Sequence, residues 1–509
     1  MTNVAKFRYK SMTDRPPVIG ELPRLIQAGM GVRISSSKLA NATSRLGALG
    51  VVSSVGLRHI IIDEIRAGNP ETVALAKSFP VARYVDELME FAPDGPKHKT
   101  PAPMDLPGPK GELPKRLSVI TSYIEVKKAQ LGHKGKIGVN VMWKCSLTVL
   151  PSIYGAMLAG VDALLCGAGV PMELPDIIRR VRSGSDLQYQ PLHGTGTNVQ
   201  LSIAQDETAS LFRRMAPPHL MPIISNFAFC KRILDVWHRE YDGAKPYAFI
   251  LENHEAGGHN APPRNRVSFG EQDDLTTYFD KVRNLGVNVY VAGDGSSREE
   301  YQSWIDQGAY GVQVGSRFAL CTDSGMRDDL RDKIIERNAN GETIVQTSNR
   351  LSPTGYPFKQ VPLAGTLSDA GVYEARKRIC NKGYLLQSHV EALPDGTEKE
   401  TYICPAMPAK QYAKLGGDNA DLTDRVCLCN ALFSTAGLGE TIEPALVTLG
   451  KFGASVTVKR SAREIIEDLL TPAFVAAAER RLTQTLDKQR QPARRVVMLP
   501  SRRLVEAVA

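Results

Sequence analysis

Short apolar segments recur along the first two thirds of the chain, and longer segments of mixed polarity separate them. In some of the longer segments, such as Leu147–Leu158 and Leu275–Leu285, apolar residues recur at the spacing of an amphipathic helix. Strands that alternate with helices are typical of a parallel α/β fold. We predict eight strands, at 22–28, 49–55, 136–142, 161–167, 221–226, 247–253, 288–293 and 310–315. Eight strands with intervening helices predict a TIM (β/α)8 barrel.

Glycine and polar residues follow several of these strands. The first strand leads into Gly29 and Gly31, and the strand Ile137–Met142 carries a polar Asn140. Active sites of TIM barrels lie where the strands end. We therefore expect these residues at the mouth of the barrel.

A Gly-Gly-His sequence follows the apolar strand Tyr247–Leu251. Gly257 and Gly258 would let the backbone approach a flat ligand closely. His259 has a side chain that can transfer protons near neutral pH. Its alternative role is a structural hydrogen bond at the strand end.

Two later strands end in glycine and a hydroxyl residue. The strand Val287–Ala292 runs into Gly293-Asp-Gly295 and two serines, and the strand after Tyr310 ends in Gly315-Ser316. Backbone N–H groups in such loops can hold an anion. The loops after strands seven and eight are the usual phosphate site of a TIM barrel, so we expect a phosphate there.

Five segments of the chain, in order, resemble the FMN-binding segments of the nitronate monooxygenase (2-nitropropane dioxygenase) family. That family's relatives include flavin-dependent enoyl-acyl-carrier-protein reductases and the trans-acting enoyl reductases of polyunsaturated fatty-acid synthases. The resemblance covers roughly residues 17–325. The matching segments are Gln27-Ala-Gly-Met-Gly31, Gly138-Val-Asn-Val-Met142, Glu255-Ala-Gly-Gly-His259, Ala292-Gly-Asp-Gly295 and Gly311-Val-Gln-Val-Gly-Ser-Arg-Phe318.

The resemblance implies an FMN site and a role for each matched residue. His259 is the expected general acid or base. The backbone would pass close to the flavin at Gly257 and Gly258. The flavin ring and ribityl chain would lie against Gln27, Gly29, Met30 and Asn140. The phosphate would be held by Gly293, Gly295, Gly315 and Ser316.

The function implied is that of an FMN-dependent oxidoreductase that oxidises an alkyl nitronate or a related small substrate with dioxygen. One alternative is an NAD(P)H-dependent enoyl reductase whose acyl substrate is carried by an acyl carrier protein. Another is a specialised biosynthetic dehydrogenase that couples FMN to a cluster held by C-terminal cysteines. The family's members share the FMN site and differ in the pocket, so these alternatives remain open.

The chain of 509 residues is longer than one average domain. We predict an N-terminal arm at 1–16, the FMN-binding barrel at 17–370 and a largely helical extension at 371–509 that covers the barrel or mediates dimer contacts. Two insertions interrupt the barrel. Residues 92–118 are rich in Pro, Gly and Lys and predict a surface loop, and residues 183–218, with His193-Gly-Thr-Gly-Thr197, are a candidate cover for the pocket.

After the eighth strand comes Ser352-Pro-Thr-Gly-Tyr-Pro-Phe-Lys359. In the resembling family a segment at this place packs over the flavin. Tyr356 and Lys359 are therefore candidates for the pocket wall, and an ordinary loop is the alternative.

The formal net charge is +9, and many basic residues lie near the C-terminus, between Arg480 and Arg503. Such a tail is either a solvated end or a contact for an acidic partner such as an acyl carrier protein. Without interleaved aromatic residues it does not indicate nucleic-acid binding. No apolar segment approaches the length of a membrane span, and the N-terminus lacks the apolar core of a signal peptide, so we expect a cytoplasmic protein.

The eight cysteines fall into two groups. Cys145, Cys166, Cys230 and Cys321 occur singly in barrel segments, where small buried residues are expected. The other four lie within fifty residues of one another. They could bind zinc, hold an iron–sulfur cluster, or serve as structural or redox-active thiols. These four are Cys380, Cys404, Cys427 and Cys429.

Overall fold

The computed structural model describes residues 21–92, 112–190, 199–202, 208–212, 215–393, 395–438 and 443–484. In this part of the chain, one sheet has eight parallel strands in the order β1-β10-β9-β8-β7-β4-β3-β2. The strands are β1 (Leu25–Gln27), β2 (Gly50–Ser53), β3 (Ile137–Met142), β4 (Ala163–Gly167), β7 (His219–Ile224), β8 (Ala248–Glu252), β9 (Asn288–Ala292) and β10 (Gly311–Val314). Each overlaps one predicted strand, so all eight predictions are confirmed.

The two ends of the sheet meet between β1 and β2. A parallel bridge joins Ile26 to Leu49. The N–H of Leu49 donates to the carbonyl of Leu25 at 2.9 Å, and the N–H of Gln27 donates to the carbonyl of Leu49 at 3.0 Å. These bonds close the sheet, and the predicted TIM barrel is confirmed.

Alternate strand residues face the inside and the outside of the barrel. The inner core contains Ile26, Leu165 and Ile250. Their neighbours Leu25, Leu164 and Phe249 belong to the core between the strands and the helices. This alternation follows from the two-residue period of a strand. It also decides which strand residues can reach a site at the barrel mouth.

Helices surround the barrel, as the amphipathic segments predict. The segment Leu147–Leu158 forms a helix almost as expected, whereas Leu275–Leu285 forms only a 3-10 turn and the short helix α10. The helices of this part are α1 (Ser37–Ser44), α2 (Leu57–Arg66), α3 (Pro70–Lys77), α4 (Ala82–Phe91), α5 (Glu112–Ala129), α6 (Ser146–Leu158), α7 (Leu174–Ser183), α8 (Ala209–Phe212), α9 (Phe227–Glu240), α10 (Phe279–Arg283), α11 (Arg298–Asp306) and α12 (Ser316–Ala319).

The two predicted insertions are described only in part. The expected surface loop at 92–118 is wrong for residues 112–118, which begin α5 and bury Leu117 against the core. The second insertion contains an antiparallel pair, β5 (Leu187–Tyr189) with β6 (Val199–Leu201). Its segment His193–Thr197 lies outside the described residues, so its predicted role as a cover stays a prediction.

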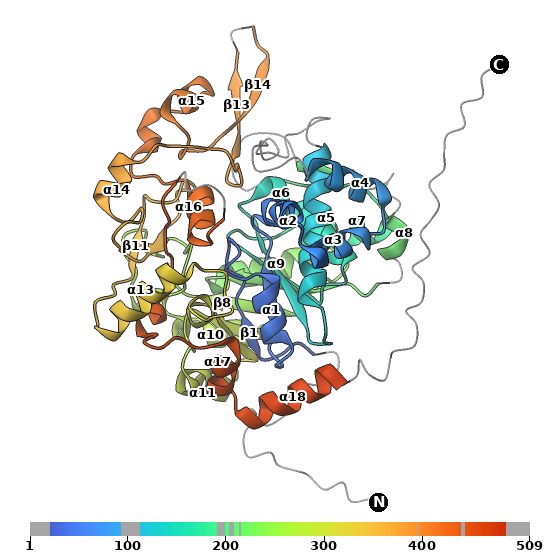
Figure 1. The fold of residues 1–509 in the computed structure, drawn as a ribbon, viewed down its shortest axis with the longest axis vertical. Helices are drawn as coiled ribbons and strands as arrows, with labels where there is room; N and C mark the ends of the chain where they lie inside the picture. The colour runs from blue at the N-terminus through green and yellow to red at the C-terminus, as the bar shows by residue number, and fades with distance from the viewer. Residues whose placement is uncertain are drawn as a thin grey trace, which may run out of the picture.

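The chain after the barrel strands contains helices and short antiparallel sheets, and its part from residue 371 on is largely helical, as predicted. The hairpin of β13 and β14 projects from the rest of the molecule (Figure 1). Asp395-Gly396, between these strands, is a typical turn sequence. The elements are α13 (Asp328–Ala339), β11 (Gln346–Ser348), β12 (Phe358–Gln360), α14 (Ala370–Ala375), β13 (Gln387–Ala392), β14 (Glu398–Ile403), α15 (Ala409–Lys414), α16 (Leu428–Thr435), α17 (Ala462–Leu469) and α18 (Pro472–Gln484).

This extension shares buried clusters with the barrel. Val32 and Leu57 of the barrel pack in one cluster with Leu428 and Phe433 of the extension. Arg317 at the barrel mouth pairs with Asp468 of α17 at 2.7 Å. The extension is therefore part of the wall above the barrel. Among the described helices, none is both long and apolar enough to cross a membrane.

Candidate active site

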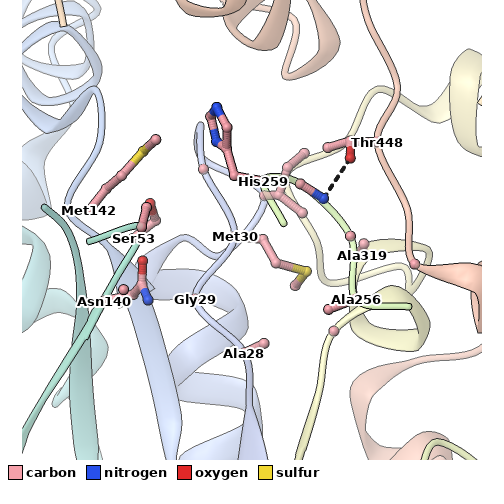
Figure 2. Close-up of a pocket in the computed structure, with 18 of the residues that line it drawn as sticks. Ala28, Gly29, Met30, Ser53, Asn140, Met142, Ala256, His259, Ala319 and Thr448 are labelled. Carbon is pink, nitrogen blue, oxygen red and sulfur yellow. Dashed lines mark hydrogen bonds between the residues drawn. The ribbon is translucent and has the colours of Figure 1, made fainter. Parts of the chain in front are cut away.

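A large cavity lies at the C-terminal ends of the barrel strands. It has about 1640 Å³ of space free of protein atoms, counted with its mouth. Each strand of the barrel, or the loop that follows it, contributes to the lining. These residues include Gly29, Ser53, Asn140, Gly167, Ile223, Glu252, Ala292 and Gln313. Figure 2 shows several of these side chains around the cavity.

Most of the residues predicted from the sequence meet in this cavity. Those that line it are Gly29, Met30, Asn140, Gly257, Gly258, His259, Gly293, Gly315 and Ser316. Gln27 and Gly295 are not among the lining residues. The five segments, far apart in the chain, therefore converge on one site.

Gln27 does not line the cavity and instead has a structural role. Gln27 is two residues after Leu25 on β1, so both side chains point to the outside of the barrel. The Gln27 side chain is fully buried there, with an exposed fraction of 0%. Its Nε2 donates to Ser35 Oγ at 2.9 Å, and its Oε1 accepts from the Val51 N–H at 3.1 Å. Gln27 thus ties the end of β1 to β2 and to the loop below the cavity.

Gly29 and Asn140 fit together where β1 and β3 end (Figure 2). A Cβ atom on residue 29 would lie 2.1 Å from Asn140 Cβ. Any larger residue at 29 would push Asn140 away. The glycine is therefore required for the close packing that keeps the Asn140 amide at the cavity.

The Gly257-Gly258 turn passes directly beneath the extension. A Cβ atom on Gly257 would lie 2.8 Å from the Gly450 nitrogen. The N–H of Gly258 donates to Thr448 Oγ1 at 2.9 Å, the dashed line in Figure 2. Thr448 and Gly450 also line the cavity. The two glycines thus let a segment of the extension close over the strand end.

Gly293, Ser296, Gly315 and Ser316 line the part of the cavity for which we expect a phosphate. Gly293 has φ +89°, and a Cβ there would lie 2.2 Å from Asn253 Oδ1. Ser316 Oγ accepts from the Gly450 N–H at 2.9 Å, which leaves its O–H able to donate. A ligand oxygen is a suitable acceptor for that O–H.

Gln313 is a lining residue for which we had no expectation, although it stands inside the last matched segment. It is 6% exposed and faces the cavity from β10. Its buried Oε1 has no hydrogen-bond partner among the described residues. A buried acceptor without a partner is destabilising, and a ligand donor in the cavity would satisfy it.

His259 is held by hydroxyl groups from the segment after the barrel. Its Nε2 lies 2.7 Å from Ser352 Oγ and 3.2 Å from Thr354 Oγ1. The ring of Phe358 stands edge-on to it, with the centroids 4.9 Å apart. The imidazole is half-buried because part of it faces the cavity. Burial, and then the positive charge of Lys144, lower the pKa of His259 well below its usual value, so the ring is neutral near pH 7.

The segment 352–359 reaches the cavity differently from our expectation. Phe358 lines the cavity, whereas Tyr356 and Lys359 are not among the lining residues. Lys359 Nζ donates to Thr347 Oγ1 at 2.7 Å, and the Tyr356 ring lies 3.4 Å from Lys144 Nζ. Ser352 and Thr354, which we did not single out, are the residues that contact His259.

Two further titratable groups lie close to the site. Burial lowers the pKa of Lys144, two residues after β3, to about 7. Burial raises the pKa of Glu252, the last residue of β8 and a cavity residue, to about 7. The only sequence signal for either was a charged residue at a strand end.

These residues fit an FMN. At Gly315 no heavy atom lies closer than 3.7 Å to an added Cβ, so the backbone there is open to a ligand. Ser316 supplies a hydroxyl donor, and Gln313 supplies an acceptor that has no partner in the described part of the chain. Apolar side chains of Met30, Val55 and Met142 supply walls for a flat ring.

Comparisons with known proteins give distant likenesses, and no family model matches the chain. A 100-residue stretch, 20% of the chain, is 29% identical to a Mycobacterium tuberculosis protein, (3aS,4S,5R,7aS)-5-hydroxy-7a-methyl-1-oxo-octahydro-1H-indene-4-carboxyl-CoA dehydrogenase, and spans about a quarter (26%) of it.

Solved structures with a similar fold show lower identity. FabK from Thermotoga maritima is 14% identical, with TM-score 0.43, over 92% of this chain and 94% of that one. A nitroalkane oxidase from Streptomyces ansochromogenes is 13% identical, with TM-score 0.44, over 90% and 97%. The enoyl reductase domain of MlnA from Bacillus amyloliquefaciens is 12% identical, with TM-score 0.44, over 92% and 96%.

Proposed function

We propose that this protein is an FMN-dependent oxidoreductase of the nitronate monooxygenase type, with His259 as its proton-transfer group. The observation that carries the proposal is the meeting of nine predicted residues in one cavity at the barrel mouth. Glycine loops suited to a phosphate and a neutral histidine share that cavity. A barrel mouth is where this fold supports catalysis.

The chain's own residues would hold the cofactor. Backbone at Gly293 and Gly315 and the Ser316 hydroxyl would bind the phosphate. Gln313 would accept a hydrogen bond, and Gly29, Met30 and Asn140 would line the ring and ribityl chain. FMN, when bound, supplies the electron transfer that protein side chains cannot carry out.

His259 would take or return a proton at a carbon of the substrate. Its lowered pKa keeps it neutral near pH 7, which is the form that accepts a proton. The hydroxyls of Ser352 and Thr354 fix the ring's orientation, as the third group does in other acid–base sites. The substrate class that we propose is an alkyl nitronate or a related small carbon acid, with dioxygen as the electron acceptor.

A second candidate is an NAD(P)H-dependent enoyl reductase acting on a carrier-bound acyl group. It is favoured by the apolar wall that the extension adds to the cavity, which suits an acyl chain. The wall consists of Leu385, Leu428, Leu432, Leu446 and Leu449. The Mycobacterium tuberculosis protein with the short match is also named for a thioester substrate, a carboxyl-CoA.

The test begins with protein reconstituted with FMN and freed of excess cofactor. Oxygen uptake on addition of an alkyl nitronate, with no bleaching of the flavin by NADPH under anaerobic conditions, would support the first candidate. Anaerobic bleaching by NADPH, followed by reoxidation with an enoyl thioester, would support the second. Failure to retain flavin after reconstitution would contradict both.

A further inference from the structure

The four cysteines of the extension meet at a small cavity next to the main one. They come from three separate segments: Cys380 precedes a turn, Cys404 follows β14, and Cys427 and Cys429 stand at the start of α16. All four line a cavity with about 220 Å³ of space free of protein atoms. Residues spread over fifty positions of the sequence thus converge on one place.

Backbone donors point at the sulfur atoms. The N–H groups of Gly383, Ala406 and Asn430 form hydrogen bonds with the thiols of Cys380, Cys404 and Cys427, respectively. The Asn430 side chain adds a bond to Cys427 Sγ at 3.4 Å. Hydrogen bonds from N–H groups to sulfur stabilise the thiolate form and tune the metal centres that thiolates bind.

Two basic side chains also lie close to the thiols. Lys382 interacts electrostatically with Cys427 and Cys429, and Arg425 interacts with Cys404. Cys429 and Cys427 are hydrogen-bonded to each other. A buried thiol becomes a good ligand when a metal replaces its proton.

Zinc and a cluster differ in the space that they need between their thiolate ligands. Among the described residues, no group of three or more Cys, His, Asp or Glu side chains is arranged to hold a single metal ion. A tetrahedral zinc with Zn–S bonds of about 2.3 Å draws its four sulfurs to within about 3.8 Å of one another. A cluster places iron and sulfide atoms between its ligands and so takes thiolates that stand farther apart. The four cysteines line a cavity with about 220 Å³ of space free of protein atoms, and such space is needed by a cluster but not by a tetrahedral zinc. The site therefore suits a cluster better than zinc.

We propose that Cys380, Cys404, Cys427 and Cys429 bind an iron–sulfur cluster at the edge of the main cavity. Leu385, Leu428 and Cys429 line both cavities, so the cluster would adjoin the proposed flavin site. This site stands independently of the proposed function, because none of the four thiols belongs to the residues expected to hold FMN.

The experiment is anaerobic purification of the full chain, followed by iron, sulfide, zinc and FMN analysis, and by electron paramagnetic resonance after reduction with dithionite. We expect iron and sulfide in equal amounts, about two or about four of each per chain, and a signal from the reduced cluster. If the iron content is low, the protein is first incubated with ferrous iron and sulfide. Zinc in place of iron, or neither metal after this incubation, would overturn the proposal.

Cysteine variants distinguish the loss of a cluster ligand from unfolding of the protein. Cys404→Ser should lose the cluster, whereas Cys230→Ser, a buried cysteine in α9 of the barrel, should keep it. FMN content and circular dichroism are measured on both, so that unfolding is recognised. Because Cys404→Ser can also unfold the extension, Cys429→Ala is made in parallel. Full iron in folded Cys404→Ser and Cys429→Ala would contradict the proposed ligands. Absence of flavin with iron intact would count against the proposed function only.

Discussion

His259 Nε2 lies 2.7 Å from Ser352 Oγ, although 93 residues separate the two in the chain. The histidine comes from the strand end that borders the cavity, and the serine comes from the segment that follows the barrel. Ser352 is itself fully buried and also bonds Thr354 Oγ1 at 2.8 Å. The proposed base is thus oriented by a part of the chain outside the barrel strands.

Replacing His259 by Asn should lower turnover by ~10²- to 10⁴-fold and leave FMN bound, because a positioned base typically contributes that much. Ser352→Ala should lower turnover about fivefold, since it removes one orienting hydrogen bond of about 1 kcal/mol. The measurements are kcat and the flavin-to-protein ratio. Unchanged turnover in His259→Asn would leave the histidine with a structural role only.

The pH dependence of the rate checks the same residue. A base works when it is unprotonated, so activity is lost as the pH falls through its pKa. Because the pKa of His259 is well below 6.5, the rate should show no loss from this group between pH 8 and pH 6.5. A rate that halves near pH 6.5 in the wild type, and no longer does so in His259→Asn, would contradict the lowered pKa.

Gln313→Met should weaken FMN binding by about tenfold and leave the FMN-free protein as stable as before or more stable. The reason is that its Oε1 has no partner among the described residues, so only a bound ligand would satisfy it. Titration with FMN gives the affinity, and urea unfolding without FMN gives the stability. If the apo protein instead loses stability and FMN affinity is unchanged, the amide serves the fold and not the cofactor.

Gly293→Ala should destabilise the protein and reduce FMN occupancy. Residue 293 has φ +89°, and a Cβ would lie 2.2 Å from Asn253 Oδ1 at the cavity wall. Gly68→Ala is the matched control, with φ +72° and no heavy atom within 4 Å of the added Cβ. The control should lose only about 1 kcal/mol through backbone strain and keep its FMN. Equal FMN occupancy in the two variants would argue against a phosphate at Gly293.

Burial of Lys144 leads to a prediction about how the free energy of unfolding depends on pH. Its pKa is about 7 in the folded protein against 10.5 for an ordinary lysine. Between these values the unfolded chain binds more protons, so this residue makes the free energy of unfolding rise with pH from about 7 to about 10. Lys144→Met should flatten that rise and add ~2–4 kcal/mol of stability at pH 7 and below.

The control for this effect is Lys77→Met, a change at an exposed residue of α3. Urea unfolding of both variants and of the wild type at pH 6.5, 8 and 9.5 gives the slopes. If the free energy of unfolding changes with pH equally in the wild type and in Lys144→Met, burial does not keep the Lys144 amine neutral.

The sequence by itself determined the barrel and most of the cavity. Strand period, helix spacing and the glycines at strand ends are local properties, and they placed all eight strands and nine cavity residues. Local reasoning was wrong about 112–118, because Pro- and Lys-rich composition hid the buried side of α5. It also put Gln27 in the cavity wall, although the two-residue period of β1 turns that side chain outward.

Only the tertiary structure decided what acts on these residues. Ser352 reaches His259, and Gly450 reaches Gly257, because the chain that follows the barrel strands folds back over the barrel mouth. The shifted pKa values of Lys144 and Glu252 depend on burial, which neighbours distant in the chain create. Four cysteines from three segments meet for the same reason. Contacts between distant residues follow from packing, and no local pattern in the sequence specifies them.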